Sequence, residues 1–121
     1  MKAVVFALLG VASVALAATA APLSPLIVGW EQYLTVDWHE TNKDGRTLVT
    51  GTVRNTSGWA AKKIQLLVDG LDPNGQVVDQ RVVWLGTDLP SGQRVYFETP
   101  GIERAVSHRV RVFAFDSGKR G

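Results

Sequence analysis

Residues 61–85 read AKKIQLLVDGLDPNGQVVDQRVVWL, and this stretch decides the fold. Its centre, DPNG at 72–75, has the proline and glycine positions of a type I turn. Before the turn, apolar residues recur with the period of a β-strand, and the predicted inward set is Ile64, Leu66 and Val68. Residues 76–85 are the returning strand, so the stretch predicts an antiparallel hairpin.

The same pattern recurs on both sides of this hairpin. Further strands are predicted over 34–39, 46–54, 94–99 and 108–115. Turn sequences separate them, namely NKDG at 42–45, NTSG at 55–58 and LPSG at 89–92. No window indicates an amphipathic helix. The sequence therefore predicts an all-β domain over residues 33–116, an antiparallel immunoglobulin-like β-sandwich of six to seven strands.

The first 20 residues are predicted to be a signal peptide. Lys2 precedes an apolar run of small residues from Ala3 to Ala17, and small-x-small cleavage patterns follow, the second ending at Ala20. Cleavage there predicts an exported protein, periplasmic or extracellular, with no integral membrane segment. The alternative is an uncleaved membrane anchor, which the short, alanine-rich run disfavours.

The two ends of the remaining chain are predicted to lie outside the sandwich. Pro22 and Pro25 prevent regular structure, so residues 21–32 are expected to form a tether. Residues 117–121 are expected to form a flexible tail.

Charge and cysteine content exclude several classes of function. The chain has 13 basic and 11 acidic residues, and loss of Lys2 with the signal leaves a net charge of +1, so a nucleic-acid partner is not expected. The chain has no cysteine, which excludes disulfides, thiolate metal sites, a catalytic thiol and a lipid-modified cysteine. An exported protein without disulfides fits a bacterial envelope.

The search for chemistry-bearing residues predicts no catalytic, cofactor-binding or metal-ligating residue, and no cofactor. The two histidines, His39 and His108, are expected at the surface or at a strand edge, and they lack a metal-ligand spacing. Asp37 lies on the same side of a strand as His39, so His39 is the residue for which a metal or catalytic role is hardest to exclude. The serines lie in turns and loops, outside any nucleophile elbow.

Four tryptophans are many for a domain of this size. Trp38 shares a strand face with Leu34 and Val36, so it is expected in the core. Trp59 and Trp84 fit either a cover over the core or a contact role, because exposed tryptophan beside arginine is common in interfaces. The candidate contact surface consists of Trp59, Arg81, Trp84, Arg109 and Arg111.

Two small residues have structural expectations of their own. Gly51 lacks a side chain, so a bulky neighbour such as a tryptophan is expected to cross it. Asn55 stands at a strand end and is expected to hydrogen-bond its own loop backbone.

A series of motifs resembles the FxLYD-type bacterial domains, which are small immunoglobulin-like or fibronectin-like sandwiches of exported and envelope proteins. The resemblance covers about residues 33 to 116. It rests on GxVxN at 51–55, IxLxV at 64–68, DPNGxVV at 72–78, LPxG at 89–92 with Phe97, and VxV at 110–112 with Phe115-Asp116. It implies the sandwich fold and an envelope setting, and it implies no catalytic residues. The chain departs from many envelope relatives in lacking their lipid-anchored cysteine.

Together these observations predict a non-enzymatic interaction module of the bacterial envelope. The expected partner is an envelope protein, whose identity the sequence leaves open, as it does the oligomeric state. The alternative is a binder of small ligands or carbohydrate that uses Trp59 and Trp84 for stacking. A metal or enzyme site built on His39 is the third and least favoured class.

Overall fold

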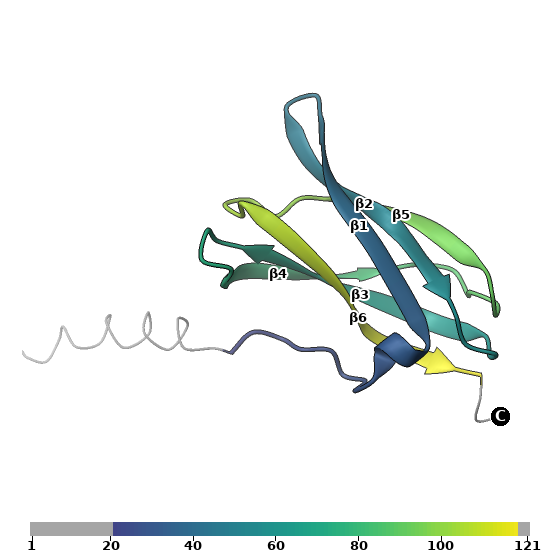
Figure 1. Ribbon diagram of the computed structural model, residues 1–121. Coiled ribbons are helices and arrows are strands. Elements are labelled where there is room, and N and C mark those ends of the chain that lie inside the picture. Colours follow the sequence, from purple (N-terminus) through teal and green to yellow (C-terminus); the bar gives the residue numbers. More distant parts are fainter. Residues whose placement is uncertain (1–20, 119–121) are drawn as a thin grey trace, which may run out of the picture.

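The computed structural model describes residues 21–118, which form two β-sheets packed face to face (Figure 1). One sheet has the strand order β1-β2-β5 and the other β4-β3-β6, with all neighbours antiparallel. The elements are a short 3-10 helix η1 (Trp30–Gln32), β1 (Leu34–Lys43), β2 (Arg46–Asn55), β3 (Ala61–Leu71), β4 (Val77–Trp84), β5 (Arg94–Pro100) and β6 (Ser107–Ser117). The predicted all-β antiparallel sandwich of six to seven strands is confirmed, with six strands.

Strands β3 and β4 form the hairpin predicted over residues 61–85. The amide of Gly75 donates to the carbonyl of Asp72 over 2.9 Å, which closes the turn. The carboxylate of Asp72 accepts from the amides of Asn74 and Gln76, and Gly75 has a φ of 80°. The turn is therefore held by the residue types that predicted it.

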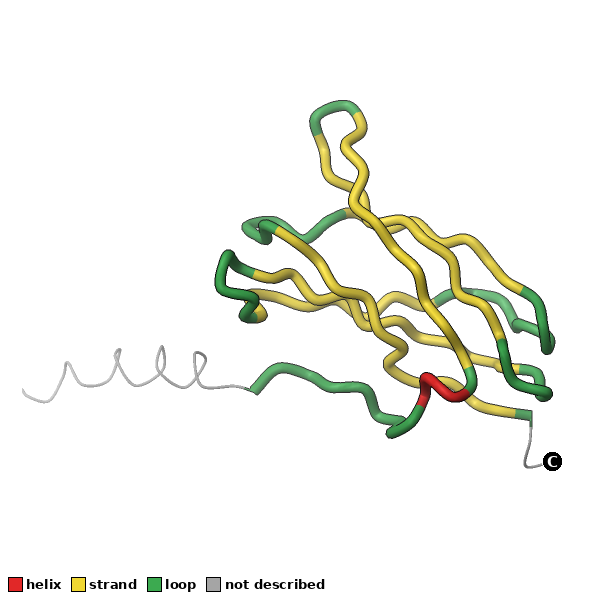
Figure 2. The backbone as a smooth tube through the Cα atoms, viewed as in Figure 1, coloured by secondary structure: helices red, strands yellow, loops and turns green. Residues whose placement is uncertain are grey.

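The core lies between the sheets and comes from alternate positions of the strands. Predicted inward residues Ile64, Leu66 and Val68 are fully buried. They pack with apolar side chains of the other strands and of the connections, including Leu34, Val49, Val53, Phe97, Val110, Val112 and Phe115. Figure 2 shows that connections join the strands at both ends of the sandwich and that η1 is the one helical turn between residues 21 and 118.

Gly51 is needed because the backbone of β1 approaches it closely. Trp38 is its register partner, as expected for a tryptophan opposite a glycine. A Cβ atom on Gly51 would nevertheless meet the carbonyl oxygen of Asp37 first, at 1.9 Å. The constraint therefore comes from the neighbouring main chain and not from an indole ring.

Asn55 organises the connection between β2 and β3, as the sequence predicts. Its amide nitrogen donates to the carbonyls of Trp59 and Leu89, over 2.7 and 2.9 Å. Its amide oxygen accepts from the backbone and the hydroxyl of Ser57. The side chain is fully buried, and its donors and acceptor are satisfied.

The ends of the chain differ in part from the sequence predictions. The predicted signal peptide, residues 1–20, lies outside the described residues, as do residues 119–121 of the predicted tail. The tail prediction began too early, because β6 continues to Ser117 and the amide of Gly118 donates to Ala60. Between residues 21 and 118, no helix has the length and apolarity needed to cross a membrane.

Candidate functional site

The outer face of the β4-β3-β6 sheet carries a buried carboxylate. Leu66 and Val68 of β3 point into the core, so the pleat places Leu67 and Asp69 on the opposite face. Both are nevertheless 0% exposed. A buried carboxylate requires hydrogen-bonding or charged partners, and Asp69 has three.

The partners of Asp69 come from the two strands that flank β3. One carboxylate oxygen accepts from Nε of Arg109 over 2.8 Å and from Nη2 of Arg111 over 2.7 Å, both from β6. The other oxygen accepts from Nε2 of Gln80 in β4, over 2.8 Å. Charge-assisted bonds of this length fix the guanidinium planes against the sheet.

Residues 21–28 are bonded to strands β4 and β6 on this side of the sheet and are called the strap below. The amide of Leu23 donates to the side-chain oxygen of Gln80 over 2.8 Å, and the Gln80 side chain donates back to the Leu23 carbonyl over 3.0 Å. Leu26 then donates to the carbonyl of Phe113 in β6. Figure 1 shows the strap beside the β4-β3-β6 sheet before the chain turns through η1 into β1. The segment predicted to be a tether is therefore bonded to the sandwich.

The positive charge on this face exceeds the negative charge. Two arginines face one carboxylate on the outward side of β4, β3 and β6. The Nε atom of Arg111 is buried and has no hydrogen-bond partner within residues 21–118. The side chain of Arg109 remains 40% exposed. The face can therefore present a fixed cation to a molecule that approaches from solvent.

The five predicted contact residues do not form one surface. Trp84 lies on the outer face with Arg109 and Arg111, opposite Gln65, and is 60% exposed. Arg81 points to the other side of β4, where Nη1 donates to Thr99 and to the carbonyl of Pro100 in the opposite sheet. Arg81 thus joins the two sheets and lies on the other side of β4 from Trp84. Trp59 lies in the loop between β2 and β3 and is 47% exposed.

Trp38 differs from its predicted core role. It lies on the inward side of β1, as its alternation with Leu34 and Val36 predicts, but it remains 37% exposed. Its indole N–H donates to the carbonyl of His108 over 3.2 Å. The side chain therefore bridges β1 and β6 at the margin of the core.

His108 is predicted at the surface or at a strand edge, and it lies near the start of the edge strand β6 with its side chain buried, so only the surface placement is wrong. Its side chain is 3% exposed, on the inward side of β6 with Val110 and Val112. Nδ1 lies 3.0 Å from a carboxylate oxygen of Glu40, and Nε2 accepts from the amide of Ile102 over 2.9 Å. A histidine beside a carboxylate resembles a general base with its orienting group. Here Nε2 accepts from a backbone amide, so the pair holds a loop.

The other histidine shows no metal-site geometry. His39 is exposed on β1, and its Nε2 lies 3.2 Å from the hydroxyl of Thr50. Within residues 21–118, no three histidine, aspartate or glutamate side chains gather as a metal site requires.

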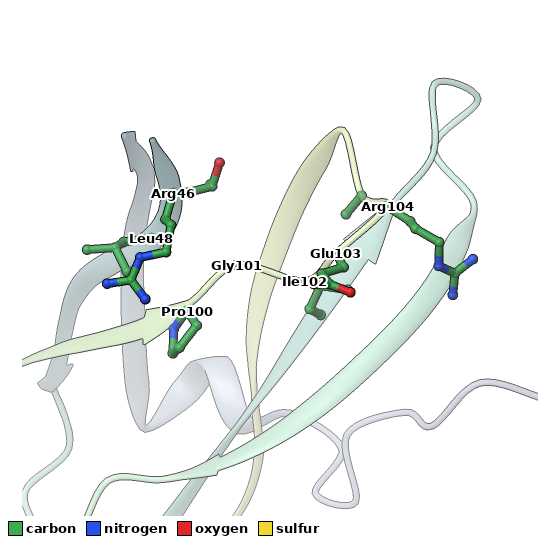
Figure 3. Close-up of a pocket in the computed structure, with 9 residues that line it drawn as sticks. Arg46, Leu48, Pro100, Gly101, Ile102, Glu103 and Arg104 are labelled. Atoms are coloured by element: carbon green, nitrogen blue, oxygen red, sulfur yellow. The ribbon is translucent and has the colours of Figure 1, made fainter. Parts of the chain in front are cut away.

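A cavity of about 400 Å³ opens at the rim of the sandwich (Figure 3). It is lined by residues 46–48 at the start of β2, by Pro100 at the end of β5 and by residues 101–105 after it. Arg46 and Arg104 extend in different directions in Figure 3, so their guanidinium groups do not converge on one ligand. No aromatic residue lines this cavity, so it offers no stacking platform for a sugar.

Sequence reasoning missed Asp69 and Gln80, although part of the signal was present. Arg109 and Arg111 stand two residues apart on one strand, and such a pair on one face needs an acceptor. Asp69 is the only acidic residue in β3. The strap lies more than 40 residues from Asp69 along the chain, and no local sequence pattern predicts that it packs on this sheet.

The chain matches no family model, no curated protein and no solved structure.

Proposed function

We propose that this chain is a non-enzymatic, exported interaction module of the bacterial envelope, of the FxLYD type, which binds a protein partner. The binding surface is the part of the outer face of the β4-β3-β6 sheet that the strap leaves exposed, around Trp84 and Arg109. The predicted export signal, the absence of cysteine and the resemblance to envelope domains support the setting.

One observation carries the proposal, namely two arginines held by the fully buried Asp69 on the face that exposes Trp84. Tryptophan and arginine are the residue types most enriched among energetically dominant interface contacts. The bonds to Asp69 restrict the arginine rotamers before a partner arrives, which lowers the entropic cost of binding. The face is therefore pre-organised for contact.

A comparison of two exposed aromatic residues tests the proposal. The chain and its Trp84→Ala variant are used to capture proteins from an envelope extract, and the Tyr96→Ala variant is the matched control. Tyr96 is 61% exposed, and it lies on the opposite sheet. We expect Trp84→Ala to weaken recovery of a specific partner by roughly thirtyfold, as for loss of a dominant contact, and Tyr96→Ala to retain it. Equal recovery by both variants would remove this face from consideration.

Carbohydrate binding is the second candidate, because both Trp59 and Trp84 are exposed. Stacking of a sugar on an indole changes tryptophan fluorescence. Titration of the chain with envelope oligosaccharides would show a saturable change, and Trp59→Phe and Trp84→Phe would reduce its amplitude. A flat titration with the intact chain excludes this candidate.

A further inference from the structure

One histidine side chain bonds the connection between β5 and β6, residues 101–106, near its start. The ends of this connection are fixed by backbone bonds, since Gly101 donates to Thr47 in β2 and Val106 donates to Leu71 in β3. Between them, the amide of Ile102 donates to Nε2 of His108 over 2.9 Å. This bond is buried, so loss of the ring nitrogen as acceptor would leave a buried amide without its hydrogen bond.

The geometry assigns the protonation state of His108. A backbone amide can only donate, so Nε2 must be an unprotonated acceptor. Nδ1 then carries the hydrogen and donates to Glu40 over 3.0 Å. The ring is therefore the neutral Nδ1–H tautomer, fixed by a partner on each side.

The loop contains backbone strain close to this contact. Arg104 is a non-glycine residue with a φ of 71°, in the left-handed region that side chains disfavour. Residues 101–105 also line the cavity at the rim of the sandwich. Release of the Ile102 amide would let Arg104 relax and would change the shape of the cavity wall.

We propose that His108 is a pH-sensitive latch, and that its protonation releases the Ile102–Ala105 segment and remodels the adjoining cavity. A second proton can enter the ring only at Nε2, where the new N–H would face the N–H of Ile102. The latch is closed while the ring is neutral and open once the ring is protonated.

The surrounding charges fix the direction of the response. From β1, the carboxylate of Glu40 faces Nδ1 and favours a charged ring. From the loop, the N–H of Ile102 disfavours a charged ring, because it donates to the nitrogen that would take the proton. From β3, the register partner of His108 is Gly70, which has no side chain. The other charged groups of this region line the cavity, namely Glu103 and Arg104 from the loop and Arg46 from β2.

Hydrogen exchange of the Ile102 amide tests the latch, with rates corrected for the intrinsic effect of pH. We expect its protection to fall about tenfold between pH 7.5 and pH 5.5, as for the loss of one buried hydrogen bond. The His108→Gln variant cannot titrate, and its amide can accept from Ile102 and donate to Glu40, so its protection should not change. His39→Gln is the matched control and should respond as the intact chain does.

Two further measurements keep the proposal testable if His108→Gln does not fold. Nitrogen NMR of the intact chain at pH 7.5 should show the Nδ1–H tautomer for His108. Glu40→Gln should move the loss of Ile102 protection to lower pH, because the charged ring loses its ion-pair partner. An Nε2–H tautomer, or equal Ile102 protection of the intact chain at both pH values, would overturn the latch.

Discussion

Asp69 places a carboxylate at 0% exposure on the side of a sheet that normally faces water. Buried ion pairs add little net stability, because desolvation offsets much of the attraction. Such a pair instead penalises any arrangement that leaves a charge without its partner. Asp69 therefore specifies the alignment of β3 with β4 and β6, and it holds the two arginines in place.

The Asp69→Asn variant should lose about 2–4 kcal/mol of unfolding free energy. One oxygen of Asp69 faces two arginines and the other faces Gln80, so all three partners are donors. Either orientation of the asparagine amide would set an N–H group against a donor. Urea denaturation measures the loss. Asp79→Asn is the control, since Asp79 is exposed and should change stability by less than about 0.5 kcal/mol. Equal effects of the two substitutions would contradict the role of Asp69.

The Gly51→Ala variant should be destabilised by about 2–4 kcal/mol. The added Cβ would lie 1.9 Å from the carbonyl oxygen of Asp37, so β1 and β2 would have to separate locally. Gly58→Ala is the matched control, because its Cβ would meet nothing within 4 Å. Thermal unfolding of the two variants distinguishes them. A Gly51→Ala midpoint equal to that of Gly58→Ala would show that the strands can move apart freely.

At the scale of elements, the strap adds a hydrogen-bonded segment to the outer side of the β4-β3-β6 sheet. It bonds to Gln80 of β4 and to the Phe113 carbonyl of β6, the strands on either side of the buried Leu67 and Asp69. Gln80 is the central residue of this contact, because its side-chain amide bonds both the strap backbone and Asp69. The side chain thus connects the strap to the buried carboxylate.

The Gln80→Ala variant should detach the strap without unfolding the sandwich. Both bonds to Leu23 and the bond to Asp69 would be lost, and stability should fall by about 1–3 kcal/mol. Limited proteolysis should then cut within residues 21–28 much faster than in the intact chain, and exchange of the Leu26 amide should accelerate. Gln65→Ala, on the same face, should leave both rates unchanged. Unaltered cleavage of Gln80→Ala would show that Phe113 alone retains the strap.

Turn chemistry and apolar alternation predicted the strands well, because both are local properties. DPNG at 72–75 and the alternation of Ile64, Leu66 and Val68 correspond to the observed hairpin and core. The side of β4 on which Arg81 lies could also have been predicted. Residues three apart on a strand, such as Arg81 and Trp84, point to opposite sides. His108 likewise shares the phase of Val110.

The burial of Asp69 and the latch at His108 could not have been predicted in the same way. The buried Asp69 bonds to Gln80, which in turn bonds to a strap whose prolines indicate only irregular structure. The contact between His108 and Glu40 joins residues 68 apart in the chain. Such contacts depend on how the two sheets pack against each other, which a single sequence does not specify.

At the scale of the molecule, the sandwich depends on pairings between distant parts of the chain. The β3–β6 pairing brings together Ala61 and Ser117, and the β2–β5 pairing brings together Leu48 and Pro100. Arg81 then joins the sheets along one side, and Trp38 joins β1 to β6. These links make one cooperative unit of the two sheets.

The chain should therefore fold slowly for its size, over milliseconds to seconds, because distant segments must meet before their contacts stabilise them. Stopped-flow tryptophan fluorescence at several urea concentrations measures the rate. A refolding relaxation complete within about 100 μs would indicate that local contacts dominate the transition state.

The buried amide of Asn55 has a consequence for the choice of expression host. Asn55-Thr56-Ser57 is an acceptor sequence for N-linked glycans. In the folded chain the amide nitrogen is inaccessible and donates to Trp59 and Leu89. A eukaryotic secretory pathway attaches its glycan to nascent chain, before this site closes. A sugar on Asn55 would occupy the nitrogen that the β2–β3 connection needs, so glycosylated molecules would be excluded from the native fold.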